Sequence, residues 1–276
     1  MTTTIEDVPA QVRIGTAGWS IGADASASFP RSGSNLERYG QVFPAAEVNS
    51  SFHRPHRPAT WARWRDSVPD SFRFSVKMPK TISHERKLVD CGELVAEFLA
   101  QVEALGEKLG VLLLQLPPKL AFDREVAESF LHDLCSRCAV NIAVEPRHPS
   151  WFDEEPDELL DKLGIARVVA DPAICPAAAA PGGWPGLRYW RLHGSPIKYR
   201  SSYADRLETY ADLLRRQAVE RWCIFDNTAS SAAISDAIKL HELLEHPRPP
   251  GRADAVVSAS REQGTGAEPG GLPSRV

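Results

Sequence analysis

Eight short apolar runs recur along this chain, and polar or turn-forming residues bound each of them. Short runs rich in branched and aromatic side chains are typical of buried β-strands. The strands that this pattern predicts are Val12–Ala17, Ala45–Asn49, Phe72–Lys77, Val111–Leu116, Asn141–Glu145, Arg167–Asp171, Leu187–His193 and Trp222–Asp226.

Between the predicted strands, apolar residues recur at helical spacing. We expect helices at Leu36–Val42, Ala59–Ser67, Glu93–Leu109, Arg124–Arg137, Asp157–Leu163, Asp205–Val219 and Ser230–Leu244. Strands that alternate with helices pair in parallel through right-handed crossovers. The pattern therefore predicts an α/β fold, a single (β/α)8 barrel of the TIM type. Its helix between the sixth and seventh strands is short or missing.

A doubly wound open sheet is the alternative fold for the same alternation of strands and helices. That fold usually carries a glycine-rich phosphate-binding motif directly after its first strand. No such motif follows residue 17 here. The barrel is therefore the favoured interpretation.

Composition indicates one large domain followed by a tail. A length of 276 residues with 43% hydrophobic residues is typical of a single α/β barrel, which we place at residues 12–246. Ten of the 30 residues in 247–276 are Pro or Gly, and none of them is aromatic. Such a segment buries too little apolar surface to order itself, so we expect a disordered tail.

Net charge and cysteine content bear on location and partners. The formal net charge of −4 argues against general coating of nucleic acid, although it leaves room for a locally basic cleft. The first residues lack the pattern of a signal peptide, and no apolar run approaches the roughly 18 residues of a membrane span. Five irregularly spaced cysteines fit reduced thiols. We expect a cytoplasmic protein with no membrane partner.

Polar residues stand at the C-terminal ends of the predicted strands, where barrels of this type place their chemistry. Alternation along a strand puts Glu47 and Asn49 on one face, and Arg191 and His193 on one face of a later strand. A charged side chain that faces a closed interior needs a partner or a function, because unpaired burial costs several kcal/mol. These strand ends therefore predict a site.

Three of these residues are candidates for catalysis, namely Glu145, His193 and Lys77. Burial can raise the pKa of a carboxyl such as Glu145 toward neutrality, which suits a general acid or base. The same carboxylate also suits a structural ion pair with Lys77 or Arg191. His193 suits proton transfer, metal binding or a hydrogen bond that fixes a carboxylate.

Cations outnumber anions in the loops that follow the predicted strands, although the whole chain is acidic. This local reversal predicts a small anionic ligand, a phosphate or a carboxylate, held by guanidinium groups. The candidate ligand-binding residues are Glu47, Asn49, Arg54, Gln115, Arg147, His148, Asp171, Arg191, Tyr199, Asp226 and Asn227.

Carboxylates and a histidine at several strand ends are also donors that a divalent metal accepts. Their spacing matches no established metal-binding motif, so a divalent metal has no support from spacing. The sequence leaves the cofactor open.

Seven segments of the chain together resemble the YecE-like family, which is known as a domain of unknown function. They are Ile14–Trp19, Glu47–Phe52, Phe72–Lys77, Leu114–Pro118, Ala143–Trp151, Arg191–Gly194 and Phe225–Thr228. The resemblance implies a TIM-barrel fold, in agreement with the strand count. It implies no particular reaction.

Three functions stay open after these observations, and whether the chain is an enzyme stays open with them. The first is a protein that acts on a small anionic ligand, as an enzyme would, at the C-terminal mouth of the barrel. The second is a nucleic-acid-binding barrel, for example a metal-dependent phosphodiesterase, which the cationic and aromatic loops favour and the net charge opposes. The third is a non-catalytic scaffold. The sequence does not determine the oligomeric state.

Overall fold

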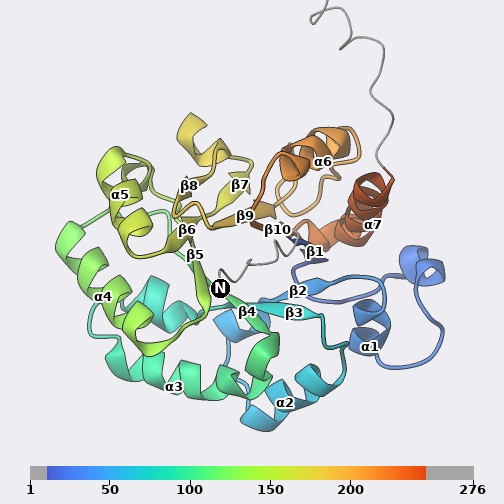
Figure 1. Cartoon of the computed structure of the whole chain (residues 1–276), viewed down its shortest axis with the longest axis horizontal. Coiled ribbons are helices and arrows are strands. Elements are labelled where there is room, and N and C mark those ends of the chain that lie inside the picture. The colour runs from blue at the N-terminus through green and yellow to red at the C-terminus, as the bar shows by residue number, and fades with distance from the viewer. Residues whose placement is uncertain (1–10, 247–276) are drawn as a thin grey trace, which may run out of the picture.

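A computed structural model of the chain describes residues 11–246. The predicted tail at residues 247–276 lies outside the described residues, so its predicted disorder stays a prediction. Figure 1 shows the strands at the centre of the molecule and the helices arranged around them. No helix in residues 11–246 is both long enough and apolar enough to cross a membrane.

The strands form two sheets in the described part of the chain. Their bounds are β1 Val12–Thr16, β2 Ala45–Val48, β3 Arg73–Lys77, β4 Leu109–Gln115, β5 Asn141–Glu145, β6 Ile165–Arg167, β7 Val169–Asp171, β8 Gly182–Gly183, β9 Leu187–Leu192 and β10 Glu220–Phe225. One sheet has the order β1-β10-β9-β7, and the other has the order β2-β3-β4-β5-β6-β8. The strand pairs within them are parallel except for β6 and β8, so the second sheet is mixed.

The two sheets meet at two places. At the first, Ala17 forms an isolated parallel bridge with Glu47, and the amide of Gly18 donates to the Glu47 carbonyl at 2.8 Å. At the second, Val168 alone separates β6 of one sheet from β7 of the other. The Val168 amide donates to the carbonyl of Val144 on β5 at 2.9 Å. The strands therefore have a TIM-barrel-like arrangement.

Helices connect most of the strands. Their bounds are α1 Asn35–Gly40, α2 Pro58–Asp66, α3 Gly92–Val102, α4 Arg124–Arg137, α5 Glu154–Lys162, α6 Leu207–Arg215 and α7 Ala232–Glu245. Short helical turns add η1 Ala23–Ser28, η2 Ser50–Phe52, η3 Thr81–Glu85, η4 Glu103–Lys108, η5 Pro149–Trp151, η6 Pro176–Ala179 and η7 Thr228–Ser230. Side-chain hydrogen bonds to backbone amides fix where two of these helices begin. Ser34 and Glu37 form a capping box at α1, and the Asp123 carboxylate caps α4.

The buried apolar residues form two separate clusters, as expected when alternate strand positions face opposite sides. The larger cluster joins outward strand residues to the helices. The smaller one consists almost entirely of strand residues, including Val111, Leu113 and Ala143. In it the rings of Tyr189 and Trp222 stack with centroids 5.9 Å apart. Apolar packing thus fills the space between the strands up to Tyr189, and the polar site begins there.

The sixth predicted strand, Arg167–Asp171, differs most from the observed structure. The observed strand starts earlier, at Ile165, and is interrupted at Val168. Its first part, β6, pairs with β5, and its second part, β7, pairs with β9. The guanidinium of Arg167 is held by Asp157 of α5, with Nε and Oδ1 2.7 Å apart. Only tertiary pairing selects this interruption, and the apolar pattern carries no trace of it.

The antiparallel strand β8 was missed by the sequence analysis because its residues, Gly182 and Gly183, carry no hydrophobic signal. A β-carbon on Gly182 would lie 2.1 Å from the Arg167 guanidinium, so glycine is required for this close approach. The short or missing helix predicted between the sixth and seventh strands agrees with η6, the only helical turn described between residues 172 and 185.

A substitution at Gly15 of β1 can test how closely the two sheets approach each other. A β-carbon there would lie 2.2 Å from the carbonyl oxygen of Ala45 on β2, and neither backbone can move without disturbing its strand. We expect Gly15→Ala to lower the free energy of unfolding by about 3 kcal/mol or more, at the upper end of overpacking costs. Denaturant unfolding measures this change.

Gly92→Ala is the matched control, because its β-carbon would meet only the end of the Arg137 side chain at 3.5 Å. Since Gly92 lies at the start of α3, alanine there should be neutral or stabilising by up to about 1 kcal/mol. Equal unfolding free energies for the two variants would show that β1 and β2 are not this close.

Candidate functional site

Charged side chains from both sheets meet at the C-terminal ends of the strands. We call this set the ion network, and it consists of Glu47 on β2, Glu145 on β5, Arg191 on β9, His193 directly after β9 and Asp226 directly after β10. All five side chains are nearly or fully buried. The sequence analysis had selected each of them as a candidate.

Arg191 is the centre of the ion network. Its Nε and Nη2 donate to the two oxygens of Glu47 at 2.9 and 2.6 Å, which is a bidentate pair. Its Nη1 donates to Glu145, and its Nη2 also reaches Asp226 Oδ2 at 3.1 Å. Burial alone would lower the pKa of Arg191, but the charges of these three carboxylates raise that pKa well above its ordinary value.

Tyr189 supports the network from the apolar side. Its hydroxyl donates to Glu47 Oε2 at 2.9 Å and lies 2.8 Å from the hydroxyl of Ser75 on β3. Tyr189, Arg191 and His193 alternate along β9 and its end, so their side chains project to one side. The sequence analysis expected Arg191 and His193 on one face. With Tyr189 they bring β9 into contact with β2, β3 and β5.

His193 lies between two carboxylates. Its Nδ1 is 2.9 Å from Asp226 Oδ2, and its Nε2 is 2.9 Å from Glu145 Oε1. Arg147 Nη2 also approaches Nε2 of His193, at 3.4 Å. The geometry therefore suits a histidine that is held in one orientation by Glu145 and Asp226.

Glu145 does not have the raised pKa that the sequence analysis expected of a general acid. Burial would raise it, but the charges of Arg191, His193 and Arg147 hold the pKa of Glu145 well below its usual range. Arg147 donates to Glu145 Oε1 through Nη2 at 2.9 Å and through Nε at 3.2 Å. Glu145 is thus an ionised anchor with several cationic partners. The expectation of a raised pKa was wrong because the sequence does not give the number of these partners.

Lys77 ends β3 and is buried beside the network, with 8% of its surface exposed. Its ammonium lies 4.1 Å from the centre of the Phe52 ring, a cation–π contact. Within residues 11–246 no carboxylate forms an ion pair with it. Burial, followed by the charge of Arg191, lowers the pKa of Lys77 to about 8, although nearby carboxylates oppose this.

A histidine packs against the same phenylalanine ring. The ring of His84 packs edge-on against Phe52, with centroids 4.9 Å apart. Burial lowers the pKa of His84, and the charges of Lys77, Arg147 and Lys80 lower it further. Positive charge therefore accumulates around Phe52.

A small hollow opens beside the network. Glu145, Arg147, His193 and Lys198 are among the residues that line it, and its volume is about 20 Å³. A space of about 10–15 Å³ holds one water molecule. This hollow therefore admits a water-sized group, and a larger ligand would have to sit above it.

Three other predicted residues lie at the edge of the network. The Asn49 amide donates to Asp226 Oδ1 at 3.4 Å. Gln115 is the strand partner of Glu145 in the β4–β5 pair and is mostly buried. The Tyr199 ring packs edge-on against His193, with centroids 5.9 Å apart, and is 40% exposed.

Two predicted residues turn away from the network into structural contacts. The Asp171 carboxylate accepts from Arg206 Nη1 at 3.1 Å and from the Tyr210 hydroxyl, so it faces α6. The Asn227 amide donates to Asp236 Oδ2 of α7 at 2.7 Å. Both side chains fix helices to strand ends.

The last two predicted residues, His148 and Arg54, also lie outside the network. Nδ1 of His148 accepts from the amide of Ser150 at 3.2 Å, so His148 caps the N-terminus of η5. Arg54 borders a separate pocket with Trp61 and other residues from α2 and α3. The sequence analysis missed that pocket, because apolar residues at helical spacing are most simply read as core.

No group of three or more His, Cys, Asp or Glu side chains within residues 11–246 is arranged to hold a metal ion. The carboxylates of the ion network instead share the guanidinium of Arg191. The cofactor therefore stays open.

Comparison with known proteins gives relatives of similar sequence and similar fold. UPF0759 protein YecE of Escherichia coli K12 is 35% identical over 144 residues, which cover 50% of this chain and 52% of YecE. The match thus spans about half the length of that relative. UPF0759 protein YunF of Bacillus subtilis is 22% identical over 270 residues, which cover 85% of this chain and 95% of YunF.

Two solved structures have the same fold. A DUF72 family protein from Thermotoga maritima MSB8 is 26% identical with a TM-score of 0.69, covering 85% of this chain and 99% of its own. One from Enterococcus faecalis V583 is 20% identical with a TM-score of 0.71, covering 88% and 100%. The family model described as a protein of unknown function, DUF72, matches residues 13–257. The chain therefore belongs to the DUF72 family.

Proposed function

We propose that this chain binds a small anionic molecule, a phosphate or a carboxylate, above the ion network, with Lys77 as the main cationic contact. The observation that carries the proposal is the ammonium of Lys77, a mostly buried residue that forms no ion pair with a carboxylate in residues 11–246 and lies near other cations. Burying a charge without a partner costs free energy. An anionic ligand would supply the missing partner.

Arg147 is the second cation for such a ligand. Its guanidinium is only partly occupied by Glu145, and its side chain is 15% exposed. Planar guanidinium groups bind carboxylates and phosphates through two parallel hydrogen bonds. Arg191, in contrast, is fully buried and shared by three carboxylates, so its role in the proposal is to hold Glu47, Glu145 and Asp226 in place.

If a reaction takes place, Lys77 is the residue proposed to exchange a proton with the ligand. A group with a pKa of about 8 has both protonation states available near neutral pH, as general acids and bases require. Glu145 and His193 are proposed to orient Arg147 and the ligand, since both are bound from several sides.

We also propose that the two sheets form one closed (β/α)8 barrel within a domain of residues 12–246. The Ala17–Glu47 bridge supports closure on one side, together with Tyr39, whose hydroxyl bonds both Thr16 and Ala45. The continuous chain through Val168 supports closure on the other side. The network would then lie at the C-terminal mouth, where barrels place their sites.

Lys77→Met tests the proposed binding. Methionine keeps most of the side-chain volume and removes the buried charge. We expect sugar phosphates or small carboxylates that raise the melting temperature of the wild type to lose that effect in the variant. The melting temperature without ligand should stay equal or rise. Thermal-shift assays, with titration calorimetry on the ligands that respond, measure both.

Lys162→Met is the control, because Lys162 lies on α5 with 68% of its side chain exposed. It removes one positive charge at a distance and should keep binding. Unchanged binding in Lys77→Met would refute Lys77 as the main cationic contact. No response of the wild type to any ligand would refute the proposal as a whole and favour a scaffold. A response only to single-stranded or duplex DNA, falling steeply with salt, would favour nucleic-acid binding instead.

The pKa of Lys77 sets a pH dependence for binding. Below a pKa of about 8 the amine carries its charge, and above it the charge is lost. With a carboxylate ligand, which is ionised above about pH 5, affinity should be constant from about pH 5 to neutral pH. It should then fall above pH 8 by up to about tenfold per unit. Lys77→Arg, if it binds, should remove this fall because arginine stays protonated. Calorimetry across the pH range decides between a flat and a falling profile.

Arg191→Met tests the structural role of the network. The substitution leaves three buried carboxylates without their shared partner, so we expect unfolding to become easier by about 3–5 kcal/mol. Arg124→Met, which removes exposed ion pairs with Glu128 and Glu155, should cost at most about 1 kcal/mol. Chemical denaturation measures both variants, and similar small losses would mean that Arg191 does not stabilise the fold.

A further inference from the structure

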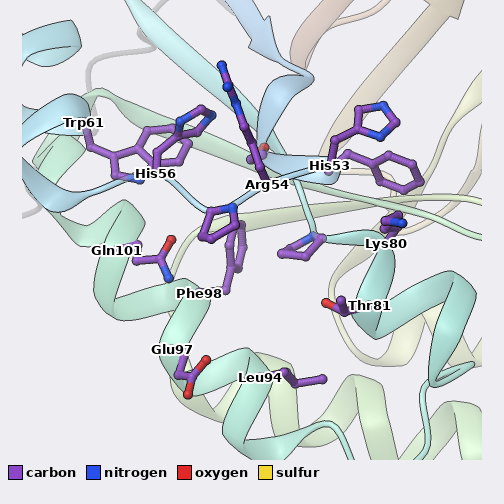
Figure 2. A pocket seen from close by; sticks show the side chains of 14 residues that line it. His53, Arg54, His56, Trp61, Lys80, Thr81, Leu94, Glu97, Phe98 and Gln101 are labelled. Atoms are coloured by element: carbon purple, nitrogen blue, oxygen red, sulfur yellow. The ribbon is translucent and has the colours of Figure 1, made fainter.

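A second pocket is lined in part by Phe52, whose ring also contacts the ammonium of Lys77. It is bounded by the segment that follows β2, by residues 79–81 after β3 and by α3, and its volume is about 200 Å³. Figure 2 shows Trp61 and Gln101 along one side of it and Lys80 and Thr81 along the other. No residue of the ion network lines it.

The walls of the pocket are mostly flat and apolar. Phe52, Trp61 and Phe98 contribute aromatic rings, and Leu94 adds an aliphatic side chain. His56 stands among them, with its ring edge-on to Trp61 at 5.4 Å between centroids. Walls of aromatic and aliphatic side chains with few polar groups are typical of small-molecule sites.

Trp61 carries a hydrogen-bond donor without an acceptor. The residue is 1% exposed, and its indole nitrogen has no hydrogen-bond partner within residues 11–246. Buried indole N–H groups usually find a partner, because a donor left unpaired costs about 1–3 kcal/mol. Because Trp61 lines the pocket, a bound molecule with a hydrogen-bond acceptor could pair with this donor.

The charged side chains that line the pocket, Arg54, Lys80 and Glu97, are of both signs and so do not specify an ion. The imidazole of His56 bonds the Ser50 hydroxyl at 2.8 Å, and burial, followed by the charge of Arg54, lowers the pKa of His56, which favours the neutral ring. Lys80 is paired with Glu85 at 3.1 Å. In Figure 2 the Arg54 side chain extends away from the space between the other side chains. A neutral ligand suits these surroundings.

We propose that this pocket binds a small neutral aromatic molecule that carries a hydrogen-bond acceptor. Its ring packs among Phe52, Trp61 and Phe98, and its acceptor, a carbonyl or ring nitrogen, receives the Trp61 N–H. Aromatic side chains favour edge-to-face and offset contacts with such a ring. The volume suits one ring rather than a drug-sized molecule, whose sites usually measure about 300–1,000 Å³.

Benzamide is the probe for this site, and the indole N–H signal of Trp61 is the readout. The signal is assigned in ¹⁵N-labelled protein as the one that disappears in Trp61→Phe. We expect millimolar benzamide to shift this signal in the wild type. Toluene lacks an acceptor and cyclohexanecarboxamide lacks a flat ring, so both should bind about 2- to 10-fold more weakly. Trp61→Phe lacks this signal, so its binding is followed through backbone amide signals, and it should weaken benzamide binding by a similar factor.

Leu94→Trp fills the pocket and should abolish the benzamide response, whereas Leu213→Trp on the exposed side of α6 should leave it unchanged. Far-ultraviolet circular dichroism and the melting temperature establish that each variant is folded. If Leu94→Trp does not fold, Thr81→Trp replaces it as the filling variant.

The proposal is overturned by any of three results. The first is an unshifted Trp61 signal at millimolar benzamide, and the second is equal binding of toluene or cyclohexanecarboxamide. The third is benzamide binding that survives in the filled variant. Since Lys77 takes no part in this pocket, Lys77→Met should bind benzamide normally. The site can therefore fail independently of anion binding above the ion network.

Discussion

The rest of this structure depends on the ion pairs that the fully buried guanidinium of Arg191 forms with three carboxylates. From β9 in one sheet it binds Glu47 on β2 and Glu145 on β5 in the other, as well as Asp226 after β10 in its own. Each carboxylate would be costly to bury alone. The shared guanidinium gives all three a cationic partner and holds the strand ends at fixed positions. The sheets are thus joined by charge at the same end where the polar site begins.

Two buried cations near this site differ in how they affect the stability of the fold. Arg191 has three carboxylate partners at ion-pair distance, whereas the mostly buried Lys77 has a cation–π contact with Phe52 and no ion pair within residues 11–246. Proteins retain a destabilising buried charge most often where it serves a ligand or a reaction. The contrast between these two cations is the reason for basing the proposed function on Lys77 and assigning Arg191 a structural role.

Much of the fold could be predicted, because each strand and helix has a local signature. β5 and α4 have the predicted bounds to the residue, since an apolar run and a capped amphipathic segment define them. The interruption at Val168 and the glycine strand β8 could not be predicted, because long-range pairing creates both. Likewise the sequence selected Asp171 for the site, but Arg206 and Tyr210 draw its side chain toward α6.

By itself, the sequence determined which residues stand at strand ends and which of them share a face, because the two-residue alternation of a strand is local. Only the tertiary structure decided their partners. Arg191 and Glu47 are 144 residues apart in the chain, so nothing local specifies their pairing or the resulting low pKa of the nearby Glu145. The unpaired Trp61 donor is likewise invisible in an amphipathic helix. Partners and cavities are properties of packing, which no single segment encodes.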